Sequence, residues 1–383
     1  MPSFEFATAS RIIFGAGKLN SLAEQLKEGV KRLLLVRGRS SDAIPRVREI
    51  LTAKGIQFTE FEVHGEPTVE VVRAGTETAR DCDAVIGLGG GSVLDAGKAI
   101  AILATNPGDV LDYLEVIGKG KKFTLALLSY IAIPTTAGTG TEVTRNAVIE
   151  SPAHGVKVSL RSPLMLPSLA LVDPELTYNL PPAVTASTGL DALTQLIEPF
   201  VSVKASPLTD ALCREGMRHA ARALRQVYQN GGDQEAREGM SLASLFGGLA
   251  LANAALGAVH GFAGPLGGML HAPHGAICAR LLPFVMEANL GALLTRQPGH
   301  PALGRYAEIA QILTDNPAAS AFDGVQWVSE LVRDLNIPAL SIYGMSREHF
   351  PEAVEKTIKS SSFKGNPIPL TDVELMGILE KAT

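Results

Sequence analysis

The stretch VIGLGGGSVLDAGKAIA, from Val85 to Ala101, decides the fold class. It opens with a short apolar run typical of a buried strand, passes through three consecutive glycines, and continues with the spacing of a helix. We expect Ser92 to cap this helix, with Asp95 three residues later as its partner in a capping box. A strand that leads through a tight turn into a helix is the repeating unit of a parallel α/β sheet.

The sequence on both sides alternates in the same way. Strand patterns lie at residues 32–38, 56–63, 83–91 and 130–136, and helical patterns lie at residues 44–54, 68–81 and 92–106. Two more strand-like pieces lie within residues 157–176, and only helical periods remain after residues 179–182. We therefore predict an α/β domain over residues 1–180 and an all-helical domain over residues 181–383.

Composition excludes several classes of protein. The 383 residues are 46% apolar and 19% charged, with a net charge of -5 and no dense basic stripe, so nucleic acid is not an expected partner. The three cysteines form no CxxC pair, which suits a reducing cytosol and predicts no thiolate metal site. The N-terminus lacks a secretory pattern, so we expect a cytoplasmic protein. The uncharged run at residues 241–259 is expected to be a buried helix and not a membrane span.

Two polar turns follow neighbouring strands of the predicted sheet. The glycines at residues 89–91 let a backbone approach a phosphate, and the helix that follows offers free N–H groups. Threonines crowd the turn after the strand at 130–136, and ligands of open α/β sheets bind at such strand ends. The alternatives are an ordinary glycine-rich turn and a set of threonine turn caps. The threonines are Thr135, Thr136, Thr139, Thr141 and Thr144.

The helical half contains polar side chains in apolar surroundings. Asp191 and Gln195 lie four residues apart and therefore share one helical face. His260, His271 and His274 fall within fifteen residues of otherwise apolar sequence. A single buried histidine is more often a satisfied core residue, but this combination predicts a metal site built between helices.

Taken together, these motifs resemble the iron-containing, or group III, alcohol dehydrogenase family. The resemblance covers essentially the whole chain and implies a dehydroquinate synthase-like architecture. That architecture has an α/β dinucleotide-binding domain, an all-α metal-binding domain and a cleft between them. The motifs that carry it are RIIFGAGKL, GGGSVLDAGKAIA, PTTAGTGTE, LVDPEL, GLDALTQLIEPFVS, HAPHGAICARLLPFVMEAN and NPIPLTDVELMGILEKA.

The resemblance implies a role for individual residues. The glycine-rich turn would bind the cofactor pyrophosphate, the threonine turn would lie beside the cofactor, and Lys157 would act at the cofactor or in catalysis. Metal ligands are expected at Asp191, His260 and His274, with Gln195 at the fourth ligand position as a weaker, neutral donor. The residues implied in cofactor binding are Gly89, Gly90, Gly91, Ser92, Asp95, Thr135, Thr136, Thr139 and Lys157.

Two positions depart from the family pattern. Gln195 stands where a fourth ligand histidine is expected, so we expect looser metal binding or a different preferred ion, and tighter binding after Gln195→His. Gly264 stands where the family commonly has a histidine near the nicotinamide. His271 is an additional histidine and is our candidate for a catalytic role there, beside Lys157.

The resemblance implies an NAD(P)-dependent alcohol dehydrogenase or aldehyde reductase that exchanges hydride between nicotinamide and a substrate polarised by Fe²⁺ or Zn²⁺. Arg37, Gly38 and Arg39 end the strand at residues 32–38 without a carboxylate, which favours NADPH; the alternative is two solvent-facing arginines. We expect a small alcohol or aldehyde substrate and a homo-oligomer such as a dimer. The alternatives are a metal-independent enzyme of the maleylacetate reductase type and a non-catalytic dinucleotide-binding protein.

Overall fold

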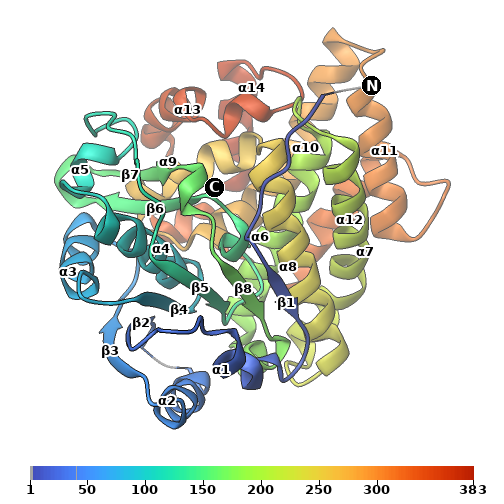
Figure 1. Cartoon of the computed structure of the whole chain (residues 1–383). Coiled ribbons are helices and arrows are strands. Elements are labelled where there is room, and N and C mark those ends of the chain that lie inside the picture. Colours follow the sequence, from blue (N-terminus) through green and yellow to red (C-terminus); the bar gives the residue numbers. More distant parts are fainter. Residues whose placement is uncertain (1–2, 40) are drawn as a thin grey trace. The chain divides into compact units, whose positions relative to one another are not determined.

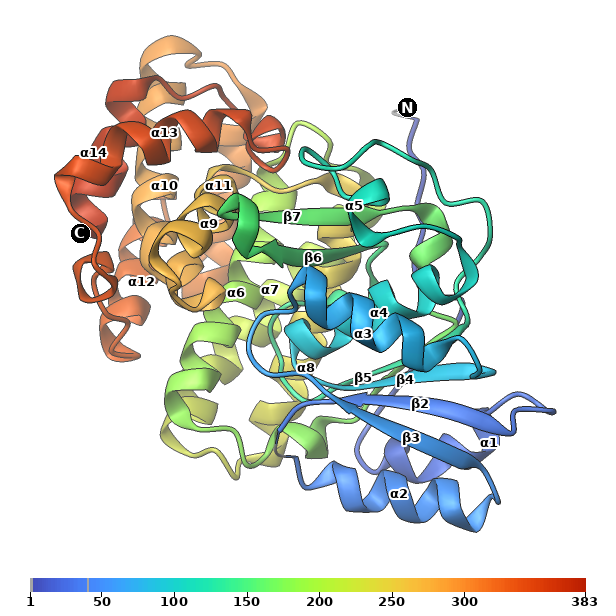
Figure 2. The same cartoon turned by 90° about the vertical axis from the view of Figure 1, so that its left-hand side faces the viewer.

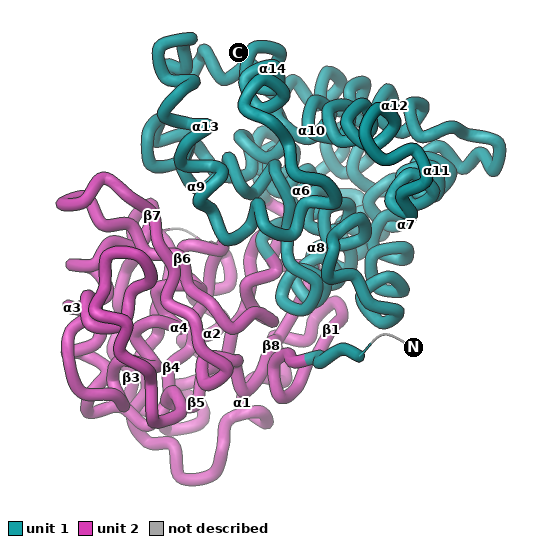
Figure 3. The backbone as a smooth tube through the Cα atoms, turned by 90° about the horizontal axis from the view of Figure 1, so that it is seen from above, with its two compact units in different colours: residues 1–6, 137–139, 180–383 teal, residues 7–136, 140–179 magenta. Residues whose placement is uncertain are grey.

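The computed structural model describes residues 3–39 and 41–383 and separates into two compact units, shown in different colours in Figure 3. The α/β unit comprises Ala7–Thr136 and Gly140–Asn179. The helical unit comprises residues 3–6, Ala137–Thr139 and Leu180–Thr383. Along the chain, the last change from one unit to the other falls between Asn179 and Leu180.

The α/β unit is built on a parallel sheet, as predicted. Among the described residues the sheet has six strands in the order β1-β8-β5-β4-β2-β3, and a separate antiparallel pair is formed by β6 and β7. Two strands were not predicted, β1 and β6, and β1 is too short to show a period. The strands are β1 (Ile12–Phe14), β2 (Arg32–Arg37), β3 (Gln57–Glu62), β4 (Ala84–Gly89), β5 (Ser129–Pro134), β6 (Asn146–Ser151), β7 (Val156–Arg161) and β8 (Leu169–Val172).

Both faces of this sheet are covered, which explains the apolar strands. In β2, Leu34 and Val36 belong to one core cluster, whereas Leu33 and Leu35 belong to the other, because successive side chains of a strand point to opposite faces. Helices α3 and α4 lie on one face and α2 lies on the other (Figure 2). The helices of this unit are α1 (Leu22–Gln25), α2 (Ala43–Ala53), α3 (Val69–Ala79), α4 (Gly91–Thr105) and α5 (Val110–Tyr113).

The helix after the glycine-rich turn is capped two residues earlier than predicted. Helix α4 already begins at Gly91, its N-cap is Gly90, and no side chain caps it, so the predicted capping box of Ser92 and Asp95 is wrong. The Asp95 carboxylate instead accepts hydrogen bonds from the Thr141 hydroxyl and from the backbone N–H of Val148. Asp95 therefore ties α4 to the chain that leads into and through β6.

A fully buried cation completes this connection. The Lys98 ammonium donates hydrogen bonds to the Thr141 carbonyl at 2.7 Å, the Thr144 hydroxyl at 3.0 Å and the Asn146 carbonyl at 2.8 Å. Burial lowers the pKa of Lys98 to about 8, although the charges of Asp95 and Glu142 oppose this shift. A buried ammonium is tolerated here because oxygen atoms satisfy it.

The helical unit surrounds α6, and the predicted all-helical half is confirmed. Every residue of α6 from Gly189 to Val201 is buried, because α7, α8 and α10 pack around it (Figure 1). The helices are α6 (Pro182–Val201), α7 (Pro207–Gln229), α8 (Gln234–Ala254), α9 (Ala258–Leu270), α10 (His274–Arg296), α11 (Pro301–Thr314), α12 (Ala321–Asp334), α13 (Phe350–Lys359) and α14 (Asp372–Ala382).

The apolar run at residues 241–259 is not one helix. It breaks between α8 and α9, which meet at a bend of 99°, and Ala255 in the break has a positive φ of 62°. By length and composition α10 is apolar enough to cross a membrane, and so is the bent pair α8–α9 taken as one span. Core helices pass the same test, and 67% of the apolar window of α10 is buried.

Glu142 predicts a pH dependence of stability. Burial raises the pKa of its carboxyl from 4.5 to about 7, against the opposing charge of Lys98. Between these two pH values the folded state holds a proton that the unfolded state has lost, so Glu142 makes stability fall as pH rises through this window, by on the order of 3 kcal/mol. Replacing Glu142 by Gln should remove this part of the decline.

The measurement is the free energy of unfolding of wild type and Glu142→Gln at about pH 5 and about pH 8. The variant should gain stability relative to wild type at the higher pH. Glu49→Gln, an exposed change on α2, should leave the difference constant. A difference for Glu142→Gln that does not change with pH would contradict the prediction.

Candidate functional site

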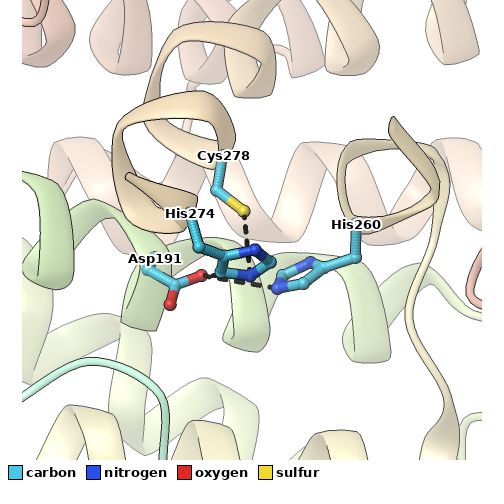
Figure 4. Close-up of side chains that lie close together, drawn as sticks. All are labelled: Asp191, His260, His274 and Cys278. Carbon is cyan, nitrogen blue, oxygen red and sulfur yellow. Dashed lines mark hydrogen bonds and ion pairs between the residues drawn. The ribbon is translucent and has the colours of Figure 1, made fainter. Parts of the chain in front are cut away.

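Four polar side chains meet inside the helical unit. Asp191 comes from α6, His260 from α9, and His274 and Cys278 from α10 (Figure 4). Asp191 Oδ1 lies 3.4 Å from His260 Nε2 and 3.9 Å from His274 Nε2, and Cys278 Sγ lies 3.6 Å from His274 Nε2. All four ligand atoms lie within 4.8 Å of one another. We refer to these four residues as the donor cluster.

Several polar atoms in and near the donor cluster are buried and have no hydrogen-bond partner. Among the described residues, the buried side-chain atoms without a hydrogen-bond partner are Asp191 Oδ1, Gln195 Oε1 and His260 Nε2. Buried polar atoms are almost always paired, and an unpaired one costs about 1–3 kcal/mol. Since two of these atoms belong to the donor cluster, a positive group bound there would satisfy both of them.

The spacing of the donor cluster fits a bound divalent cation. Ligand bonds of about 2.0–2.3 Å in a tetrahedral zinc site place neighbouring ligand atoms about 3.3–3.7 Å apart. Two of the distances, 3.4 and 3.6 Å, fall in this range, and the third, 3.9 Å, lies just above it. Carboxylate, imidazole and thiolate groups are all established ligands of such ions.

The electrostatic environment also favours positive charge. Burial alone would lower the pKa of His274, but the neighbouring side chains of Cys278 and Asp191 raise it to about 9. His260 behaves in the same way, because burial is outweighed and its pKa rises well above 6.5. Burial opposes ionisation of Asp191, yet the neighbouring imidazoles of His260 and His274 hold its pKa below 3.8. A cation can take the place of these protons.

Glu198 orients the His260 ring. Its Oε2 lies 2.6 Å from His260 Nδ1, and its Oε1 accepts a hydrogen bond of 2.7 Å from the backbone N–H of Val259. An imidazole that donates from Nδ1 presents its Nε2 lone pair to the donor cluster. Gly257 is needed beside this carboxylate, because a Cβ there would lie 2.8 Å from Glu198 Oε1.

Close approach of α10 to α6 positions the other two donors. A Cβ on Gly275 would lie 2.6 Å from the backbone carbonyl oxygen of Ser187, so only glycine allows this contact. The first turn of α10 is thereby held against α6. Because His274 and Cys278 lie four residues apart on α10, both side chains project from the same face of that helix.

Other residues implicated by the sequence have different surroundings. The Gln195 side chain lies against α8, where a Cβ on Gly247 would be 3.2 Å from its Cβ and 3.6 Å from its Oε1. His271 is exposed at the C-cap of α9, has a left-handed backbone, and lies outside the donor cluster. A Cβ on Gly264 would meet nothing within 4 Å. The space of the absent family histidine is therefore open.

The cysteine prediction needs correction. The absence of a CxxC pair predicts no thiolate at the metal site, yet Cys278 Sγ lies in the donor cluster. The spacing that matters is the four residues from His274, which form one helical turn. Glu198 was also missed, although Asp191, Gln195 and Glu198 share one helical face at positions i, i+4 and i+7.

In the α/β unit, the predicted cofactor turns follow adjacent strands. Gly38 follows β2, and its N–H bonds to the Leu88 carbonyl of β4 at 3.4 Å. Thr135 follows β5, and its N–H bonds to the Gly89 carbonyl at 3.0 Å. A Cβ on Gly90 would lie 3.4 Å from the Thr136 methyl group. The structure therefore brings these turns together at the carboxyl edge of the sheet, at the ends of β2, β4 and β5.

The other residues predicted to contact the cofactor differ in exposure and in ion pairing. Arg37 is committed to ion pairs with Glu60 at 2.6 Å and Glu62 at 2.7 Å, so it is not a free partner for a phosphate. Arg39 is exposed. The Lys157 ammonium lies 3.5 Å from Glu66, and its side chain is largely buried. Ser92 is half-buried in the first turn of α4, and Thr139 belongs to the helical unit.

A parallel sheet with a glycine-rich turn in one unit, and a buried Asp–His donor cluster in a helical unit, are the features that define the metal-containing dehydrogenase class. The family model described as iron-containing alcohol dehydrogenase matches residues 9–174. The model described as the C-terminal domain of the Fe-containing alcohol dehydrogenase family matches residues 185–383.

Individual relatives and solved structures are similar to this chain over nearly its whole length. Alcohol dehydrogenase 4 of Schizosaccharomyces pombe is 36% identical over 392 residues, covering 100% of this chain and 90% of the relative. A crystal structure of 1,3-propanediol oxidoreductase superposes with a TM-score of 0.92 at 33% identity, covering 100% of both chains. Sulfoacetaldehyde reductase of Bifidobacterium kashiwanohense, solved with NAD⁺, superposes with a TM-score of 0.87 at 27% identity, covering 100% of this chain and 99% of that one.

The chain belongs to the iron-containing alcohol dehydrogenase family. It is an oxidoreductase that acts on CH–OH groups. The family uses a nicotinamide cofactor and a metal, and its substrates are alcohols and aldehydes of the small-molecule class.

Glu198 gives a testable consequence. Glu198→Gln keeps an acceptor for His260 Nδ1 but turns an amide NH₂ toward the N–H of Val259, so the ring should lose its fixed orientation. We expect Zn²⁺ affinity, measured by chelator competition, to fall about 10- to 100-fold. Glu238→Gln, an exposed change on α8, should have no effect. Unchanged affinity in a folded Glu198→Gln protein would contradict the positioning role.

Proposed function

We propose that the protein is an NAD(P)H-dependent alcohol dehydrogenase or aldehyde reductase whose divalent cation is held by Asp191, His260 and His274. The observation that carries this proposal is the pair of buried, unpartnered atoms Asp191 Oδ1 and His260 Nε2, with His274 Nε2 less than 4 Å from Asp191. A cation would satisfy both at once. The conclusion does not depend on Gln195.

When bound, the cation would supply Lewis-acid polarisation of the substrate oxygen. A bound nicotinamide would exchange a hydride with the carbon that carries the substrate oxygen, and the hydroxyl proton released in alcohol oxidation would leave to solvent. The reverse reaction reduces a carbonyl. Asp191, His260 and His274 would hold the cation, and Glu198 keeps the His260 ring in the orientation that ligation requires.

Cofactor binding is proposed at the carboxyl edge of the sheet. The turn Gly89–Gly91 and the N-terminus of α4 provide backbone N–H groups for the pyrophosphate, and Thr135 and Thr136 lie beside them. Thr139, Ser92 and Lys157 remain proposed contacts of the cofactor, and Lys157 and His271 remain proposed participants in catalysis. Asp95 contributes by fixing α4, since its carboxylate is already bonded internally.

We further propose that NADPH is preferred, with Arg39 as the residue that recognises the 2′-phosphate. Arg37 is occupied by Glu60 and Glu62, whereas Arg39 is exposed after β2. We also propose a cytoplasmic homo-oligomer acting on a small aldehyde or alcohol. A panel of aldehydes, ketoacids and alcohols, followed by absorbance of the reduced nicotinamide with and without added Zn²⁺ or Fe²⁺, tests the function as a whole.

The cofactor preference can be tested at Arg39. A charge-assisted contact with phosphate contributes about 1.5–3 kcal/mol, so Arg39→Ala should lower kcat/KM for NADPH about 10- to 100-fold and leave NADH nearly unchanged. Arg80→Ala, on the exposed end of α3, serves as the control. A wild-type enzyme that used NADH tenfold better than NADPH would overturn the preference.

The metal dependence can be tested at Asp191. Asp191→Asn removes the charge that holds the cation, so metal content should fall and kcat/KM should drop about a thousandfold. Asp315→Asn, an exposed change at a left-handed position that suits asparagine, should retain both. Full activity of metal-depleted wild type would instead support the metal-independent enzyme of the maleylacetate reductase type, which the departure at Gln195 favours.

A further inference from the structure

We propose that Cys278 is the fourth ligand of the bound cation and replaces the histidine that the family has at position 195. This inference rests on the proposed metal-dependent function and specifies how its site is completed. The ligand set would be one carboxylate, two imidazoles and one thiolate. A set with a sulfur donor selects a softer ion than the usual set of oxygen and nitrogen donors.

The position of Cys278 carries the first part of the argument. The thiol lies one helical turn after His274, has no solvent exposure, and places Sγ 3.6 Å from His274 Nε2. Figure 4 shows the sulfur directed toward the imidazole of His274. With Zn–S bonds of about 2.3 Å and Zn–N bonds of about 2.0–2.1 Å, a tetrahedral site separates sulfur from nitrogen by about 3.5 Å.

Independent evidence comes from the other atoms of the site. Asp191 is 2% exposed and His260 is 7% exposed, and each has a polar atom without a hydrogen-bond partner. These atoms and Cys278 Sγ belong to one cluster within 4.8 Å. The sulfur is therefore placed among groups that already need a cation.

The simpler interpretation is that Cys278 is a small apolar core residue, as buried cysteines often are. Cys213 is an example of such an apolar core cysteine in this chain. It is equally buried on α7, and it belongs to the same apolar cluster of the helical unit. Cys213 has no place in the donor cluster, so it provides a matched control for a buried thiol without a ligating role.

Gln195 is the competing candidate for the fourth position. Its side chain packs against Gly247 of α8, and its amide oxygen is neutral. A thiolate carries a full negative charge, so it binds a dication more strongly than an amide oxygen does. Gln195 Oε1 is also buried without a hydrogen-bond partner, but the charge of a thiolate and the position of Cys278 Sγ 3.6 Å from His274 Nε2 favour Cys278.

Coordination by Cys278 is a proton exchange without oxidation. The Sγ–H bond breaks, the proton leaves to solvent, and a sulfur lone pair forms the bond to the cation. Imidazole, carboxylate and thiolate together suit Zn²⁺, whereas the usual three imidazoles and one carboxylate offer no soft donor. We therefore expect this chain to bind Zn²⁺ more tightly than a relative whose site has three imidazoles and one carboxylate binds Zn²⁺.

The test uses Co²⁺ as a spectroscopic substitute for Zn²⁺ in the full-length protein. Metal is removed from wild type, Cys278→Ser and Cys213→Ser, one equivalent of Co²⁺ is added, and the near-ultraviolet and visible spectra are recorded. Thiolate ligation gives a sulfur-to-cobalt charge-transfer band in the near ultraviolet. We expect this band in wild type and Cys213→Ser, and its loss in Cys278→Ser with visible cobalt bands retained.

The possible outcomes separate this inference from the proposed function. Visible cobalt bands in wild type without the charge-transfer band would overturn Cys278 as a ligand and leave the metal site standing. No cobalt uptake by wild type would overturn both. Because the wild-type spectrum is decisive by itself, poor folding of a variant would not prevent the test.

Zinc affinity gives a second measurement that does not depend on activity. Cys278→Ser should weaken Zn²⁺ binding at least tenfold, whereas Cys213→Ser should not. Adding Gln195→His should restore affinity in the Cys278→Ser protein but gain less than tenfold in wild type, where four ligands are already present. A large gain from Gln195→His in wild type, with no loss in Cys278→Ser, would show that the fourth position had been vacant.

Discussion

The helical unit depends on one constraint, which is the burial of the Asp191 carboxylate beside the His260 imidazole. Neither Asp191 Oδ1 nor His260 Nε2 has a hydrogen-bond partner, although each is enclosed by a helix core. Such a pair is unfavourable unless a positive charge lies between its members. Helix α6, the start of α9 and the start of α10 each contribute ligand atoms around that point.

The supporting residues act by controlling distance. Gly257 leaves room for the Glu198 carboxylate, which fixes the ring of His260, and Gly275 allows α10 to touch the backbone of α6. A methyl group at either glycine would clash at under 3 Å, so the donors would move apart. The site is therefore preorganised by close helix contacts, and a cation needs little rearrangement to bind.

In the α/β unit, buried charge has a different role. Asp95 and Lys98 extend from α4 and are satisfied by the chain from Thr141 to Val148, so they fix the helix that begins at the glycine-rich turn. The sequence presented Asp95 as part of a cap, because capping boxes have the same spacing. A serine with an acidic residue three positions later cannot by itself show whether the carboxylate turns back to the helix end or forward to another strand.

The sequence alone determined the alternation of strands and helices, the change to helices near residue 180, and the polar positions Asp191, His260 and His274, because these are properties of local period and residue type. Only the tertiary structure decided which groups meet. In the tertiary structure Arg37 is paired with Glu60 and Glu62 and is therefore not a free partner for the cofactor. Cys278 lies in the donor cluster. The reason is that ligation and ion pairing depend on distances between segments far apart in the chain, which no local pattern encodes.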